Sequence, residues 1–273
     1  MTVLFGLMAA FSWAFSNVLV QRGSRGVDSR TVIFWVLLTS TVLIVPTALL
    51  VEGLAGPFDL RSLLPAVLAG VFTITGFSFL LRALRTGSLS VVSPIIATEG
   101  GFAAAMAIGL GERPGLLAIA LLGVAIIGAV LVAIEPGRRT AAGAGWAVLA
   151  AIFYAAGLIA IGLTEQGPLT AVAVTRLTSL LCAVPLFVLA ARFPPKAAIP
   201  SLLGSGVLDA VGFTCFAIAA SIGPLTVASV TASQWAIASA AIGIVLLRER
   251  LHLSQYVGIA ITVVAVTGLG LLI

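Results

Sequence analysis

The sequence predicts an all-α membrane protein in which ten transmembrane helices form a 5+5 inverted repeat around a central cavity. Three observations lead to this fold class: a strongly apolar composition, ten apolar runs of membrane-spanning length, and two halves that resemble each other. Of the 273 residues, 61% are hydrophobic and 8% are charged, and the mean hydropathy is +1.25. Because a soluble domain carries about a quarter charged residues, the chain has the composition of an integral membrane protein.

Each apolar run has the length of about 20 residues that a helix needs to cross about 30 Å of hydrocarbon. Short charged or Gly/Pro-containing segments separate the runs, as expected for loops. The first run lacks a basic leader and a cleavage site, so we expect it to be a retained span. The ten expected spans are 3–21, 31–51, 62–81, 88–110, 115–134, 143–163, 169–191, 199–220, 225–247 and 254–273.

The two halves of the chain, residues 1–136 and 143–273, are expected to be five-helix repeats joined by a loop at 137–142. Shifts of 136 and 137 residues align several positions of the first half with the second: Gly76 with Gly212, Phe77 with Phe213, Gly87 with Gly223, Leu89 with Leu225, and Glu112 with Glu249. Because five is an odd number of spans, the second copy must enter the membrane from the opposite side, which predicts an inverted repeat.

Loop charges predict the orientation. The loops after even-numbered spans carry two basic residues, Arg61 and Arg113. The loops after odd-numbered spans carry eleven basic residues: Arg22, Arg25, Arg30, Arg82, Arg85, Arg138, Arg139, Arg192, Lys196, Arg248 and Arg250. By the positive-inside rule the richer face is cytoplasmic, so we expect a multi-pass protein of the cell membrane with both termini outside. Such scattered loop charges do not indicate nucleic-acid binding.

Glu99 lies at the midpoint of the expected span 88–110. An ionised acid at that depth costs roughly 2.5 to 3.5 kcal/mol, so it normally faces a cavity or a partner. Pro94 cannot donate its amide, and Gly100 and Gly101 follow the acid, so we expect these three residues to interrupt the helix. An interrupted span beside a polar group is typical of a binding site at the membrane midplane. The alternative is a structural acid, neutralised by packing or protonation.

Arg176 and Asp209 are two further charges at membrane depth, in spans 169–191 and 199–220. In the structural interpretation Arg176 pairs with Glu99 or Asp209 and pins helices together. In the functional interpretation its guanidinium binds a substrate carboxylate or phosphate, and the acid left over after pairing binds a proton or an amine.

The repeat makes these charges unequal between the halves. Under the shifts that align the halves, Glu99 corresponds to Trp235, Asp209 to Thr73, and Arg176, with a shift of 141, to Trp35. None of these three charged positions is therefore duplicated. A cavity lined in this way suits a substrate with two chemically distinct ends.

Aromatic and amide residues form a second group of candidates: Trp13, Asn17, Tyr154, Gln234 and Trp235. Tyr154 stands at the position that corresponds to Trp13. For the aromatic residues, packing and cavity lining both remain open. Asn17 and Gln234 fit hydrogen bonds between helices better than ligand contacts.

Enzyme and metal templates do not fit the chain. Its one histidine, His252, lies in a loop, and Cys182 and Cys215 are single residues within apolar spans that form no metal-binding pair. Catalytic strings of the hydrolase, zinc-protease and P-loop types do not occur. We therefore expect neither an enzyme nor a cofactor or metal site.

Ten spans, the five-plus-five duplication, Trp13-Ala-Phe-Ser-Asn17 in the first span, Arg176 early in the seventh, and acids after the fourth and ninth resemble the EamA-type branch of the drug/metabolite transporter superfamily. The resemblance covers essentially the whole chain. It implies a basket of helices in which spans one to four and six to nine line a cavity, with export or exchange of small metabolites, commonly amino acids. The chain departs from the pattern at Trp35, and relatives are drawn with both ends in the cytoplasm, the reverse of the loop charges.

The expected function is secondary active transport of a small amino-acid-like or carboxylate-bearing metabolite by alternating access. The expected partners are that substrate, the lipid bilayer and, as candidate coupling ion, protons. Two alternatives stay open. An uncoupled facilitator would ignore a proton gradient, and a membrane scaffold or receptor would have a closed, fully packed interior.

Overall fold

The computed structural model describes residues 1–23, 27–53, 60–86, 95–96, 98–133, 143–188, 193–235, 238, 242 and 253–272. All regular secondary structure in this part of the chain is helical. The predicted loop 137–142, Pro94, Glu249 and His252 lie outside the described residues. The helices are α1 (Thr2–Gly23), α2 (Ser29–Val51), α3 (Leu60–Thr86), α5 (Glu99–Gly109), α6 (Leu116–Ala133), α7 (Ala144–Gly162), α8 (Pro168–Val188), α9 (Ile199–Ile222), α10 (Leu225–Ala232) and α12 (Leu253–Leu272).

Six of these helices are long and apolar enough to cross a membrane: α1, α2, α3, α7, α8 and α9. Two shorter apolar segments lie within α6 and α12. In contrast, α5 has 11 residues and α10 has 8. At 1.5 Å per residue these two helices are roughly 16 Å and 12 Å long, too short to cross the hydrocarbon alone.

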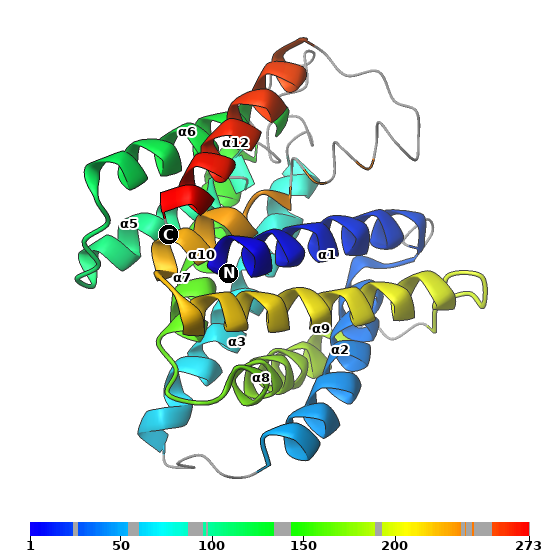
Figure 1. The fold of residues 1–273 in the computed structure, drawn as a ribbon. Helices are drawn as coiled ribbons and strands as arrows, with labels where there is room; N and C mark the ends of the chain where they lie inside the picture. Colours follow the sequence, from blue (N-terminus) through cyan, green and yellow to red (C-terminus); the bar gives the residue numbers. More distant parts are fainter. Residues whose placement is uncertain are drawn as a thin grey trace.

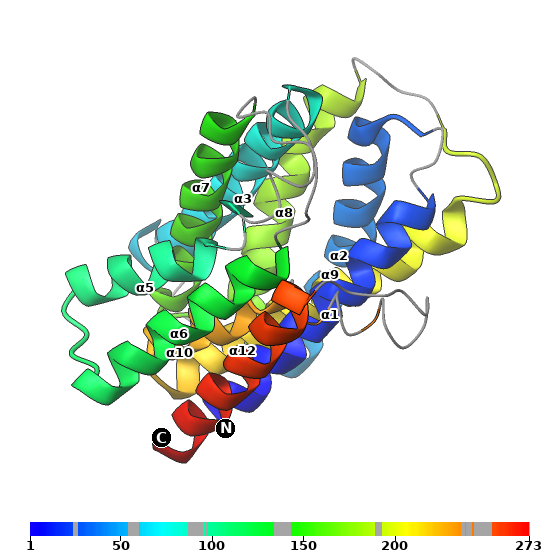
Figure 2. The same cartoon turned by 90° about the horizontal axis from the view of Figure 1, so that it is seen from above.

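Every described helix before residue 134 packs against one from after residue 143. The five pairs are α1 with α9, α2 with α8, α3 with α7, α5 with α10, and α6 with α12. Figure 1 shows α1 and α9 side by side across the middle of the bundle and α6 with α12 at one end. Figure 2 gives the same pairing for α6 and α12 from above.

The paired helices run antiparallel. On α1, Ser16 hydrogen-bonds to Ser205 of α9 at 2.6 Å, and a side chain on Gly223, just after α9, would touch Thr2 at the start of α1. Small residues at such contacts let the helix backbones approach closely, which is the main source of helix association in lipid. Alanines accordingly dominate the buried core.

We call the end of the bundle at which α1 begins the N-terminal face. The helices α2, α5, α7 and α9 end at this face, and α8 and α10 begin there, since side chains from these ends contact one another. The N-terminus and the end of α12 also lie close together in both views (Figures 1 and 2).

Candidate functional site

Arg176 and Asp209 form an ion pair between α8 and α9. The distance from Nε to Oδ2 is 3.5 Å, and the side chains are 2% and 15% exposed. This is the pairing that the structural interpretation of the sequence allowed, with Asp209 rather than Glu99 as the partner. The contact is loose, because Arg176 Nε, Arg176 Nη2 and Asp209 Oδ2 are buried without a hydrogen-bond partner among the described residues.

Phe213 covers the guanidinium of Arg176. The ring lies one turn after Asp209 on α9, and its centroid is 3.4 Å from Arg176 Cζ. A guanidinium over an aromatic face is stabilised by the ring quadrupole. The sequence reasoning used Phe213 only as a repeat marker and missed this role. The signal was its spacing of four residues from Asp209, which places both side chains on one helix face.

Trp13 of α1 completes this cluster. Its ring packs edge-on against Phe213 with the centroids 4.9 Å apart. A Cβ on Gly212 would come within 2.5 Å of Trp13 Nε1, so the indole fits there because residue 212 is a glycine. Trp13 Nε1 is itself buried without a hydrogen-bond partner in the described part of the chain. The cluster therefore presents three unused N–H donors: Nε and Nη2 of Arg176 and Nε1 of Trp13.

Glu99 forms a second polar centre with Trp235. The indole Nε1 donates to Glu99 Oε1 at 2.9 Å, and Glu99 is 7% exposed. Glu99 is the first residue of α5, and α10 ends at Ala232, shortly before Trp235. The polar contact thus lies where two short helices meet.

Gly100 and Gly101 do not interrupt the helix, contrary to the prediction. Both residues lie in the first turn of α5, and the chain is non-helical just before them, at Thr98. Gly100 instead permits close packing, because a Cβ there would come 2.7 Å from Cβ of Ser233 next to α10. A glycine costs a helix only backbone entropy, which this close approach of α5 and α10 can offset.

Tyr154 of α7 lies near both centres. It is close enough to Glu99, Arg176 and Asp209 to interact electrostatically with all three. Its ring packs over Gly76 of α3, where a Cβ would come 3.0 Å from the ring. The three charged candidates and Tyr154 therefore belong to one region of the interior.

We expected the two amide candidates, Asn17 and Gln234, to form hydrogen bonds between helices. The structure gives Gln234 a different partner. Gln234 is buried, but its Nε2 donates to the carbonyl oxygen of Val230, in the preceding turn of its own chain segment, at 2.8 Å. Asn17 is exposed on α1. The Nε2 group of Gln234 is therefore bonded within its own segment, whereas its Oε1 is buried without a hydrogen-bond partner among the described residues.

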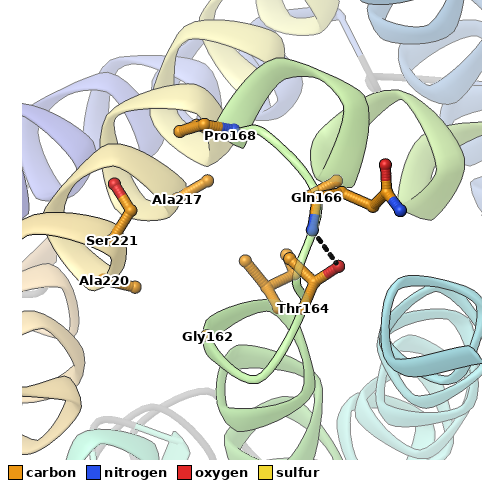
Figure 3. A pocket seen from close by; sticks show the side chains of 9 residues that line it. Gly162, Thr164, Gln166, Pro168, Ala217, Ala220 and Ser221 are labelled. Atoms are coloured by element: carbon orange, nitrogen blue, oxygen red, sulfur yellow. Dashed lines mark hydrogen bonds between the residues drawn. The ribbon is translucent and has the colours of Figure 1, made fainter. Parts of the chain in front are cut away.

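A small pocket opens at the N-terminal face between the end of α7, the start of α8 and the end of α9 (Figure 3). Thr164 and Gln166 line it from the loop before α8, and Ala217, Ala220 and Ser221 line it from α9. The backbone N–H of Gln166 donates to the Thr164 hydroxyl at 3.3 Å. This pocket does not include the polar centres deeper in the bundle.

The described residues contain no group of three His, Cys, Asp or Glu side chains that could hold a metal ion. Cys182 and Cys215 are free thiols. The charged groups of the two polar centres are one guanidinium and two carboxylates, and buried serine, threonine and glutamine side chains add to the polar groups of the described interior.

Long apolar helices that enclose buried, facing charges define a multi-pass integral membrane protein. A sequence model of the EamA-like transporter family matches residues 1–134 and, a second time, residues 141–271. The chain belongs to the EamA-like transporter family, which confirms the resemblance seen in the sequence.

Other comparisons concern the fold. A search among curated proteins found no match. A solved structure titled "Crystal structure of protein" is 16% identical, covers 100% of this chain and 99% of its own, and has a TM-score of 0.85. At this identity the likeness shows the fold alone, and it extends over the full length of both chains.

Proposed function

We propose that the protein is a secondary active transporter of a small metabolite that carries a carboxylate and an amine, working by alternating access and coupled to protons. The observation that carries this proposal is the loose Arg176–Asp209 pair. A buried polar group without a hydrogen bond costs roughly 1 to 3 kcal/mol, more when charged. An interior that leaves Arg176 Nε and Nη2 unused is suited to a ligand that takes them.

The donors define the acidic end of the substrate. Arg176 presents a planar fork that matches a carboxylate, and Phe213 holds one face of this fork. The indole N–H of Trp13, on the neighbouring ring, adds a third donor. A ligand carboxylate here would compete with Asp209 for Arg176, and the released Asp209 would then suit the ligand amine.

Glu99 supports the proton coupling. Its described partner, the Trp235 indole, is an uncharged donor, whereas Asp209 already has Arg176 as counter-charge. With Arg176 paired to Asp209, Glu99 is the acid left over and the candidate for proton binding. A buried carboxylate without a counter-charge gains from protonation, so exchange of a proton at Glu99 is the simplest coupling step.

Paired contacts support the 5+5 inverted repeat on which alternating access would rest. Trp13 packs over Gly212, and Tyr154, which corresponds to Trp13, packs over Gly76, which corresponds to Gly212. The family model likewise matches the chain twice. Rocking of residues 1–136 against 143–273 about a central cavity is the motion that such a duplication allows. The loop charges favour the termini outside.

The test is uptake of radiolabelled amino acids, first as a mixture and then singly, into proteoliposomes that contain the purified chain. We expect saturable uptake that rises with an imposed proton gradient. Arg176→Gln should abolish it by removing the carboxylate fork, and Arg176→Lys, which keeps the charge, should retain a measurable part. Glu99→Gln should leave uptake that no longer responds to the gradient.

Three outcomes would contradict parts of this function. Uptake that ignores the gradient in the parent chain indicates a facilitator. A Glu99→Gln variant with unchanged coupling removes Glu99 as the proton carrier. Absence of uptake for every amino acid, in a chain whose thermal unfolding shows that it is folded, favours a scaffold or receptor.

A further inference from the structure

Glu52 bridges the two halves of the chain at the N-terminal face. It follows α2, and its two carboxylate oxygens accept the backbone N–H groups of Leu169 at 2.9 Å and Thr170 at 2.8 Å, at the start of α8. The Thr170 hydroxyl donates to the same carboxylate at 2.7 Å. One side chain of the first half thus holds the first turn of a helix in the second half.

Glu112 makes the same arrangement a second time. It follows α5, and its oxygens accept the N–H groups of Leu225 at 2.6 Å and Thr226 at 3.0 Å, at the start of α10. The first N–H groups of a helix have no intrahelical partner and carry the positive end of its dipole, so a carboxylate is the side chain that binds them best.

The two helix starts share one tetrapeptide. Residues 167–170 and residues 223–226 both read Gly-Pro-Leu-Thr. Proline has no N–H and fits the first position of a helix, which leaves the next two N–H groups to the carboxylate. In the first copy Gly167 also lets Glu52 approach, since a Cβ there would come 2.5 Å from the carboxylate carbon.

Each bridge is connected to the candidate site through a helix. On α8, Arg176 lies six residues after Thr170, about 9 Å along the axis. On α5, Glu99 is the first residue, and Glu112 follows the end of the helix. Movement of the start of α8 away from Glu52 would therefore also displace Arg176, and movement of the start of α10 away from Glu112 would separate α10 from the helix that carries Glu99.

We propose that Glu52 and Glu112 are the two latches of a gate at the N-terminal face, and that passage of substrate on this side requires both carboxylates to release their helix starts. The proposal rests on the alternating-access function proposed above, in which the halves must separate at one face at a time. Hydrogen bonds between a carboxylate and backbone N–H groups suit this task, because water can replace both partners when the gate opens.

The pocket of Figure 3 lies beside the Glu52 latch. Pro168 and Ala171, on the first turn of α8, form part of its wall, and Ala217 of α9 faces them. Outward movement of the start of α8 would widen this pocket and expose Ala217, which is 4% exposed in the closed arrangement. Accessibility at position 217 therefore reports on the gate without any knowledge of the substrate.

The experiment combines two measurements on Glu52→Gln, Glu112→Gln and the double variant. Hydrogen exchange should show faster exchange of amides 169–170 and 225–226, by about fivefold, the effect of losing a helix cap. A cysteine introduced as Ala217→Cys, in a chain without its two native cysteines, should react several-fold faster with a membrane-impermeant maleimide in proteoliposomes. The increase should be largest in the double variant.

Glu165→Gln is the matched control. Glu165 is an exposed carboxylate in the loop before α8, so its loss changes the charge of the same face without touching either latch. The Glu165→Gln variant should show the same amide exchange and the same labelling at position 217 as the parent. Equal labelling at position 217 in all variants, despite faster amide exchange, would overturn the proposal and leave Glu52 and Glu112 as helix caps only. Absence of transport in the parent would instead overturn the proposed function, since the labelling does not depend on substrate.

Discussion

Gly100 offers a test of how closely α5 and α10 must approach at the polar centre. Glu99 and Trp235 meet at 2.9 Å next to this contact. Gly100→Ala introduces a Cβ that would come 2.7 Å from Ser233 Cβ and 3.2 Å from the carbonyl oxygen of Ser229. Carbon atoms that are not bonded prefer about 3.5 to 4.0 Å, so the two chain segments must separate by roughly 1 Å.

The destabilisation caused by Gly100→Ala depends on which atoms can move away from the added Cβ. The Ser233 hydroxyl, which lies closest to the added carbon, can rotate away only by losing its hydrogen bond to Val230, 2.9 Å long. The Ser233 Cβ cannot move without its backbone. Inserting one carbon into such a packed contact typically costs about 1 to 3 kcal/mol, and we expect Gly100→Ala to destabilise the folded protein by this amount.

The assay is thermal unfolding of the purified chain in detergent, followed by tryptophan fluorescence. Gly109→Ala, on the same helix, is the control, because no other helix or side chain among the described residues comes within 4 Å of a Cβ at that position. Its melting temperature should stay near that of the parent. Ser233→Gly should recover most of the loss, because it removes the atoms that clash. The reasoning fails if Gly100→Ala melts like Gly109→Ala, or if the effects of Gly100→Ala and Ser233→Gly simply add.

Three further outcomes can be checked on the same preparation. Phe213→Leu removes the aromatic face from Arg176, and since a cation–π contact is worth about 0.5 to 2 kcal/mol, it should raise the KM of uptake about two- to thirtyfold, whereas Phe213→Tyr should not. Gly128→Ala should lower the melting temperature without changing KM, because its Cβ would meet Thr262 of α12 in a peripheral helix pair. Ser16→Ala should cost roughly 0.6 kcal/mol of stability, a typical value for a hydrogen bond between membrane helices, by removing the bond to Ser205.

Apolar runs predicted most of the helices, because a helix in lipid needs predominantly apolar residues and such a run is visible directly in the sequence. The expected spans 31–51 and 199–220 correspond to α2 and α9 within two residues at each end. The span 88–110 is different, since the described helix begins only at Glu99. An apolar run sets which residues can lie in lipid, but the place where a helix is interrupted depends on the neighbour that packs there.

The helix that carries each charge was likewise easier to predict than the partner of that charge. The sequence placed Arg176 and Asp209 in apolar spans but left open whether Arg176 pairs with Asp209 or with Glu99, because a run of apolar residues does not indicate how its helix is rotated. The structure pairs Arg176 with Asp209 at 3.5 Å and gives Glu99 the Trp235 indole. The tetrapeptide Gly-Pro-Leu-Thr occurs twice in the sequence, at the two helix starts that Glu52 and Glu112 bind. This repetition was not used to predict the two contacts.

The contact between Glu99 and Trp235 has a special place in the proposed repeat. The two residues are equivalent positions, 136 residues apart, and a residue can touch its own equivalent only where the axis that relates the two copies passes between them. On this proposal the surplus acid lies at the centre of the rocking motion, where rotation of the halves moves atoms least. A proton carrier at that position would stay in contact with its partner while the surroundings of Arg176 change. On this proposal, proton coupling takes place at the centre of the motion and substrate binding beside it. It also explains why an acid and an indole, and not two acids, occupy equivalent positions, because two facing carboxylates would repel each other in a medium of low dielectric constant.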